Sequence, residues 1–166
     1  MGGGGGGGVS GDELKRLEEL AKKKLSESKS DSASHLFISF AYEDANEVNL
    51  LRGQAKNENS TLQFDDYSVK EAFDSKNAEY IKRQIRERID RCSVTLVYLS
   101  SKTASSRWVS WEIEESLKRG KGVIGVYQGD KPPAKLPAAF TQNKLKSAKW
   151  SHAEIMKALA DANKKR

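Results

Sequence analysis

The chain has little cysteine, little proline and no long apolar run. Its 166 residues include three prolines and one cysteine, Cys92. A lone cysteine excludes an internal disulfide framework, so we expect a buried structural thiol in a reducing cytoplasm. No apolar stretch approaches the roughly 18–20 residues that a membrane-spanning helix needs. The N-terminus lacks a charged region followed by an apolar one, so we expect no secretory signal.

Acidic side chains are scarce near the C-terminus. The formal net charge is +6, and residues 117–166 carry twelve basic but only three acidic groups. Such a basic end would attract an anionic partner or nucleotide phosphates, or it is simply a solvated lysine-rich surface, which we favour. Interleaved aromatics and known motifs are missing, so we expect no nucleic-acid partner. Cys92 and the two histidines, His35 and His152, are far apart in sequence, so we expect no metal site.

The composition divides the chain at residue 34. Residues 1–34 combine a glycine run at Gly2–Gly8, a short amphipathic stretch at Asp12–Leu25 and a serine-rich linker. We expect the glycine run to be disordered, and the amphipathic stretch to form a helix that docks on the domain or pairs with another chain. Residues 35–166 are expected to form the folded domain.

Short apolar runs alternate with amphipathic stretches along this domain. The alternation is typical of βαβ units, so the sequence predicts a flavodoxin-like, doubly wound parallel sheet of about five strands in the order 2-1-3-4-5. The predicted strands are 36–40, 61–65, 94–99, 122–127 and 148–150, and the predicted helices are 44–57, 77–91, 105–120 and 152–163. Ligands of such folds bind outside the carboxyl ends of the strands, where the loops 39–44, 65–75, 100–107 and 128–137 meet.

The predicted helix at residues 105–120 has clear start and stop signals. Ser105 or Ser106 suits the N-cap, and Gly120 suits the left-handed turn that ends a helix. Helical spacing puts Val109, Ile113, Ser116 and Leu117 on the core side, with Trp108 and Glu112 on its flank. Trp111 falls nearly opposite this stripe, which suggests packing on a neighbouring loop or on another subunit.

Residue chemistry alone leaves the role of several polar residues open. Glu112 is either a surface acid of the helix or a carboxylate that stabilises positive charge on a sugar carbon. The loop Phe40–Asp44 either holds a phosphate or ribose, or uses Asp44 only to cap the next helix. Asp65 and Asp66 are more typical of turn chemistry than of a metal site.

Four segments, taken in order, resemble Toll/interleukin-1 receptor (TIR) domains. The match is to the bacterial TIR-like group that includes the Thoeris anti-phage defence protein, and it covers about residues 35–127. The segments are His35–Asp44, Asp65–Val69, Tyr80–Ile89 and Ser100–Gly122.

This resemblance implies a chemistry and a set of site residues. Enzymatic TIR domains cleave the nicotinamide–ribose bond of NAD, which would be a substrate here and not a cofactor. Their catalytic glutamate lies four residues after a tryptophan in several members, as Glu112 follows Trp108. The nucleotide site would include Ser39, Phe40, Ala41, Asp66, Tyr67, Ser68, Ser100 and Trp108, the residues after the second strand gating the site or making assembly contacts.

The expected function is therefore NAD cleavage by a cytoplasmic signalling protein, with a cyclic ADP-ribose-type product in anti-phage defence. Self-association through the domain and a downstream effector that senses the nucleotide are the implied partners. Two alternatives stay open. One is a non-catalytic interaction module that assembles through Trp111, the arginine-rich helix and the amphipathic N-terminal stretch. The other is a sensor that binds the nucleotide without turning it over.

Overall fold

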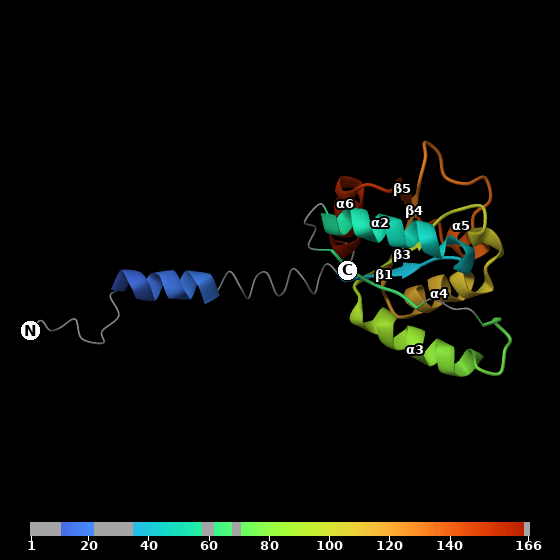
Figure 1. The fold of residues 1–166 in the computed structure, drawn as a ribbon, viewed down its shortest axis with the longest axis horizontal. Coiled ribbons are helices and arrows are strands. Elements are labelled where there is room, and N and C mark those ends of the chain that lie inside the picture. The colour runs from blue at the N-terminus through green and yellow to red at the C-terminus, as the bar shows by residue number, and fades with distance from the viewer. Residues whose placement is uncertain (1–10, 22–34, 58–61, 68–70, 165–166) are drawn as a thin grey trace, which may run out of the picture.

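The chain folds around a five-stranded parallel β-sheet. The structure, a computed structural model, describes residues 11–21, 35–57, 62–67 and 71–164. The strands lie in the order β2-β1-β3-β4-β5, which confirms the predicted topology (Figure 1). They are β1 (His35–Ser39), β2 (Gln63–Asp65), β3 (Val94–Tyr98), β4 (Gly122–Tyr127) and β5 (Ser147–Lys149). The helices are α2 (Ala45–Asn57), α3 (Ala78–Arg91), α4 (Arg107–Lys118), α5 (Ala138–Gln142) and α6 (His152–Lys164), with short 3-10 turns η1 (Tyr42–Asp44) and η2 (Thr103–Ser105).

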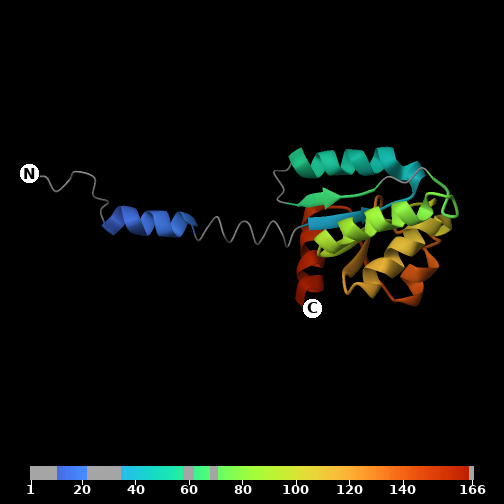
Figure 2. The ribbon, with the colours of Figure 1, turned by 90° about the horizontal axis from the view of Figure 1, so that it is seen from below.

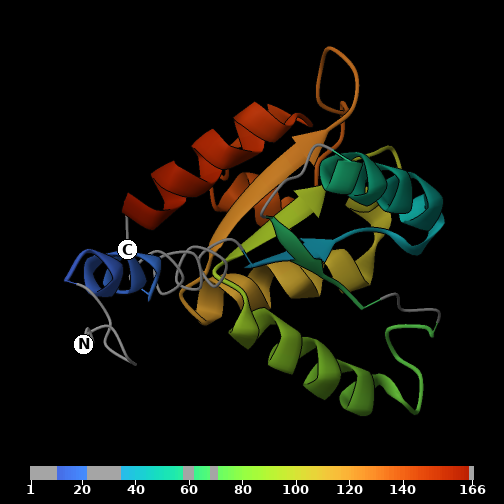
Figure 3. The same ribbon diagram turned by 60° about the vertical axis from the view of Figure 1, so that its left-hand side comes forward.

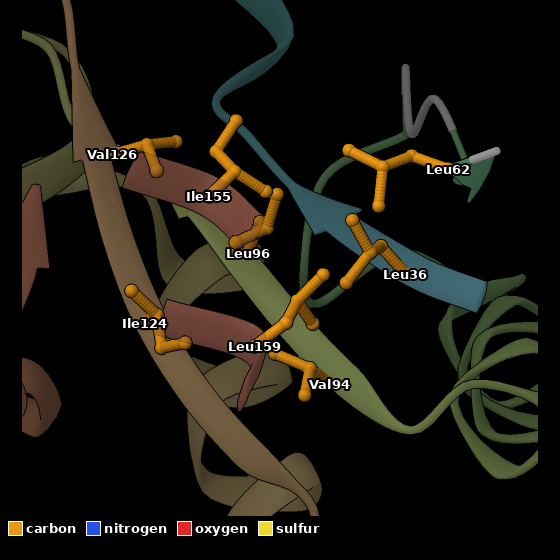
Figure 4. Packing of buried hydrophobic residues seen from close by; sticks show 8 residues of the cluster. All are labelled: Leu36, Leu62, Val94, Leu96, Ile124, Val126, Ile155 and Leu159. Carbon is orange, nitrogen blue, oxygen red and sulfur yellow. The ribbon is translucent and has the colours of Figure 1, made fainter. Parts of the chain in front are cut away.

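Helices cover both faces of the sheet, because successive strand residues point to opposite sides. Leu36 faces α6, where Ile155 and Leu159 complete a buried cluster with side chains of β3 and β4 (Figure 4). Phe37, the next residue, faces α3 on the other side. Figure 3 shows the result, with α2 and α6 on one face and α3 and α4 on the other. Both faces are buried at the inner strands, which explains why β1, β3 and β4 are mainly apolar, whereas the short edge strands β2 and β5 are not.

The predicted strands and helices of residues 35–166 are confirmed, and their bounds differ from the structure by at most two residues. The short helix α5 was not predicted, although Pro137 directly precedes it and is typical of such a start. Residues 11–21 form a helix, as predicted, and their side chains are all exposed. The glycine run, the serine-rich linker and the end of the predicted N-terminal helix lie outside the described residues. Within the described part of the chain, no helix is long and apolar enough to cross a bilayer.

The parallel register brings the carboxyl ends of the strands to one edge. Ser39 of β1 is level with Val97 of β3, which is level with Gly125 of β4. The loops after β1, β3 and β4 therefore leave the sheet side by side. The N-terminal ends of the same strands share the opposite edge.

Gly125 in β4 makes room for α5. A Cβ atom at this position would lie 2.6 Å from Leu99 Cδ1 and 2.7 Å from Phe140 Cζ, closer than real carbon contacts allow. Phe140 is fully buried in the cluster between α4 and α5. The glycine thus permits the ring to pack directly on the strand.

We expect Gly125→Ala to lower the free energy of unfolding by about 1–3 kcal/mol, because the added methyl overpacks the core. Gly53→Ala is the matched control. Nothing lies within 4 Å of its new Cβ in α2, and removing a helical glycine should raise stability by about 0.5–1 kcal/mol. Urea unfolding followed by circular dichroism measures both. A Gly125→Ala variant as stable as the wild type would contradict the packing account.

Candidate functional site

A buried carboxylate lies at the carboxyl edge of the sheet. Ser39, the last residue of β1, donates a hydrogen bond of 2.8 Å from its Oγ to Oε1 of Glu112 on α4. The Ser39 side chain is fully buried and Glu112 is only 3% exposed. An acid is seldom buried this deeply unless it is paired with a cation or put to chemical use.

Its surroundings favour the protonated form of Glu112. Burial is the main cause and raises the pKa of this carboxyl from 4.5 to about 8. The Ser39 hydroxyl lowers the pKa by hydrogen bonding to the charged form, whereas the nearby Asp66 carboxylate raises it. Free Glu112 therefore keeps its proton over most of the neutral range.

The local sequence of α4 fixes where this carboxylate points. Ser106 is the N-cap, and its Oγ accepts a hydrogen bond of 3.2 Å from the backbone N–H of Val109. One turn after Glu112, the Ser116 hydroxyl donates to the Glu112 carbonyl at 2.7 Å and lies 2.7 Å from Thr95 Oγ1 of β3. These contacts hold the middle of the helix against the sheet, so Glu112 has little freedom to turn away.

Trp108 is buried one turn before Glu112. Its indole N–H donates a hydrogen bond of 2.9 Å to the carbonyl of Glu71, and its ring packs edge-on against Phe73 at a centroid distance of 4.9 Å. The residue also belongs to the apolar cluster that Phe37 forms with α3. The indole thus ties α4 to the segment that follows β2.

Asp44 and Ser100 form a second polar cluster at the same edge. The Ser100 hydroxyl donates to the Asp44 carboxylate and accepts a hydrogen bond of 3.0 Å from the Lys102 N–H. Burial raises the pKa of Asp44 above its usual range, and the Ser100 hydrogen bond opposes that rise. Sequence analysis selected Ser100 but considered Asp44 only as a helix cap.

A neighbouring pair was missed altogether by the sequence analysis. The Tyr98 hydroxyl, at the end of β3, donates a hydrogen bond of 2.6 Å to Glu47 of α2. Burial and this acidic partner raise the pKa of Tyr98 far above its usual value. Asp44 and Glu47 are spaced i, i+3, so they lie on the same side of a helical turn. This spacing is the sequence signal that would have placed both acids at this edge.

The other predicted binding residues fall into three groups. Phe40 packs beside Val48 and Leu51 of α2, and Ala41 is buried at the start of η1. Asp66 forms an ion pair with Arg52 of α2, and the Tyr67 ring lies under the Arg88 guanidinium at 4.8 Å. Ser68 lies outside the described residues.

Asp65 and Asp66 point toward different arginines. Asp65 pairs with Arg88 at 3.6 Å and with Arg91 at 3.5 Å, both on α3. These side chains form ion pairs with helices on both faces of the sheet. The turn chemistry that we favoured is not what they show. In the described part of the chain, no three His, Cys, Asp or Glu side chains lie together as a metal ion would require.

Trp111 packs within its own chain, and a contact with another subunit stays a prediction. Its ring meets Trp108 edge-on at 6.0 Å, and the Arg86 guanidinium of α3 lies over it at 5.4 Å. Its neighbour within the chain is therefore helix α3 and not a loop, because α3 and α4 lie side by side on one face of the sheet (Figure 2). Cys92 is 3% exposed and burial raises its pKa to about 12, which confirms a buried, unreactive thiol.

The buried carboxyl predicts a specific dependence of stability on pH. Between about pH 4.5 and pH 8 the native state keeps the Glu112 proton that the unfolded chain releases. Stability should therefore fall as pH rises through this window and level off above it. Glu112→Gln removes the titration. The free energy of unfolding of this variant, relative to that of the wild type, should therefore rise by several kcal/mol between pH 5 and pH 8.5.

Urea unfolding at closely spaced pH values measures this difference. Glu114→Gln, an exposed neighbour on the same helix, is the matched control and should follow the wild type. Parallel stability curves for the wild type and Glu112→Gln would show that the carboxyl titrates normally.

Comparison with known proteins agrees with this architecture. The family model described as "Thoeris protein ThsB, TIR-like domain" matches residues 37–132, more than half of the chain. A Bacillus cereus (strain MSX-D12) protein, provisionally named cyclic ADP-D-ribose synthase ThsB1, is 32% identical over 99 residues. The match covers 57% of this chain and 52% of the relative, so the chain spans about half the length of that protein.

Two solved structures show a more distant likeness. The TIR domain of the Toll-related receptor TRR-2 from Hydra magnipapillata is 15% identical, with a TM-score of 0.49 over 76% of this chain and 91% of that one. The TIR domains of the activated Roq1 resistosome are 21% identical, with a TM-score of 0.41 over 59% of each chain. The family match is the finding that identifies the chain, which belongs to the ThsB TIR-like domain family of Thoeris proteins.

Proposed function

We propose that this chain cleaves NAD at the bond between nicotinamide and ribose and passes on a cyclic ADP-ribose-type signal in anti-phage defence. The observation that carries the proposal is the buried Glu112, held by Ser39 at the ligand edge of the sheet in a member of this family. The related Bacillus cereus protein, named as a cyclic ADP-D-ribose synthase, supports the choice of product.

The reaction suits a single carboxylate. Nicotinamide leaves NAD as a neutral molecule, because its ring nitrogen already carries the positive charge. The ribose carbon that it leaves becomes cationic, and an ionised Glu112 beside this carbon would stabilise the charge in a site of low polarity. An adenine nitrogen of the same molecule then attacks the carbon and loses a proton, which gives a cyclic product. Water in its place gives ADP-ribose.

The neighbouring residues have defined parts in this proposal. The Ser39 hydroxyl donates a hydrogen bond to Glu112 and keeps the carboxylate oriented. The loop Phe40–Asp44 and the Asp44–Ser100 pair offer polar groups for ribose and phosphate at the same edge. Trp108, one turn before Glu112, closes the side of the site next to α3.

Burial of Glu112 also sets a condition for activity. The carboxyl must lose its proton before it can stabilise a cation, and its pKa of about 8 opposes this at neutral pH. The positive nicotinamide ring of bound NAD would favour the charged form and lower that pKa. Substrate binding and activation of the carboxylate are thus coupled in this proposal.

Self-association through the domain and a downstream effector remain part of the proposal. A non-catalytic assembly module is the alternative, but Trp111, which we expected at its interface, packs against α3. Release of nicotinamide from NAD distinguishes the cleavage of NAD from a purely assembling role.

The direct test incubates purified protein with NAD, alone and with lysate from phage-infected cells, and follows nicotinamide by chromatography. Wild type should release it, and Glu112→Gln should be about 100- to 1,000-fold slower, as expected when an electrostatic group at the reacting centre is lost. Glu114→Gln should match the wild type. Equal rates for Glu112→Gln and wild type would refute the assigned role, and no turnover in either condition would leave the assembly function.

The pH profile tests the coupling to Ser39. We expect kcat/KM for NAD to rise with pH and level off above about 8, because this ratio reports the free enzyme. In Ser39→Ala the midpoint should move to higher pH, since the hydrogen bond that favours the charged carboxylate is gone. The kcat profile, which reports the NAD complex, should have its midpoint below that of kcat/KM. A flat profile between pH 6 and pH 9 would contradict this scheme.

A further inference from the structure

A groove lies at the opposite edge of the sheet from Glu112. It has a volume of about 560 Å³ and runs between the end of α4, the connection from α5 to β5, and α6. Its apolar lining includes Leu117, Val123, Ile124 and Leu145. The groove therefore offers an apolar floor far from the proposed reaction.

The first half of β4 is open along this groove. β5 pairs with β4 only from Gly125 onward, so Gly122–Ile124 have β3 on one side and no described strand on the other. An open strand edge has unpaired backbone groups, so another segment of chain can cover it together with the apolar groove beside it.

The rim of the groove is mainly basic. Lys121, Lys144, Lys146 and Lys157 line it, together with two acidic residues of α6, Glu154 and Asp161. An occupant with an apolar face and acidic flanks would fit this distribution.

Residues 11–21 have these properties. They form a helix with three exposed leucines, since Leu14, Leu17 and Leu20 are 50%, 59% and 51% exposed. The same residues carry four acidic and two basic side chains. A helix this short is marginal in water unless its apolar face is covered, so it needs a partner surface. The three lysines at 22–24 follow this segment in the sequence.

The linker length allows the helix to reach the groove. Thirteen residues, 22–34, separate the helix from His35, and a chain of that length spans at most about 45 Å. β1 starts at the edge of the sheet that carries the groove, because Leu36 is level with Val94 and Val94 with Gly122. Two strand spacings, about 10 Å, separate these positions across the sheet. Figure 2 shows α6, one wall of the groove, at the same end of the domain as the start of β1.

We propose that residues 11–21 dock as a helix in this groove of their own chain. The leucine face packs on the partly exposed Leu117, Leu145 and Ala148, and the acidic residues face the lysine rim, which is the helix-in-groove mode of recognition. Docking within one chain is favoured over binding between chains because a short linker gives an effective concentration in the millimolar range. The docked helix covers the open edge of β4 and leaves the Glu112 edge free.

Disulfide trapping in the full-length chain tests this proposal. Leu17→Cys is combined with Lys157→Cys on the groove rim, and in a matched control with Lys56→Cys. Lys56 is an exposed lysine near the end of α2, which covers the same face of the sheet as α6, but it does not line the groove. The natural Cys92 is buried, so it should not compete. We expect an intramolecular bond between positions 17 and 157 that forms at least ten times faster than the bond between 17 and 56, measured by mass spectrometry under mild oxidation.

Two further variants separate docking from chance collision. Lys144→Glu with Lys146→Glu, added to the trapping pair, should slow the bond, whereas Lys131→Glu with Lys135→Glu in the loop after β4 should not. Leu14→Asn with Leu20→Asn should also slow it. Equal rates for the groove and control pairs would overturn the proposal. Disulfides that join two chains instead of one would also overturn it, because a second copy would then fill the groove.

Discussion

The hydrogen bond between Ser39 and Glu112 is the contact on which the proposed chemistry depends. It joins the end of β1 to the middle of α4 and satisfies an acid that is almost fully removed from water. The fold makes this contact possible because β1 lies between β2 and β3, where the direction of the connections reverses. Burial then gives the carboxyl an affinity for its proton that an exposed glutamate would not have.

The rest of the structure supports that contact from both sides. Ser116 and Thr95 hold α4 on β3, and Trp108 links α4 to the segment after β2. On the other flank, the Asp44–Ser100 pair joins the loop after β1 to the loop after β3. The ligand edge is therefore rich in buried polar groups, whereas the opposite edge carries a wide groove with a basic rim. We infer that the two edges serve different purposes, chemistry at one and coverage by the N-terminal helix at the other.

Local signals made the fold predictable. The apolar runs of β1, β3 and β4 are buried on both faces, and Ser106 and Gly120 mark the ends of α4, so these elements could be placed from sequence. Contacts between distant segments could not. Ser39 and Glu112 are 73 residues apart, and Asp44 and Ser100 are 56 apart, so no periodicity reveals either pair. Trp111 was misjudged because the helical pattern shows one buried side of α4, and the second exists only because α3 lies beside it. The family resemblance, and not the spacing, singled out Glu112.

The most direct test of this account is the titration of the Glu112 carboxyl itself. Carbon-13 NMR of labelled protein would follow it, with the signal assigned by its loss in Glu112→Gln. The account predicts a midpoint near pH 8 in the free protein, and a lower one when a non-cleavable NAD analogue that keeps the cationic ring is bound. A midpoint near 4.5 in the free protein, or one that the analogue does not move, would contradict the claim that burial keeps Glu112 protonated and that bound NAD lowers the pKa of this carboxyl.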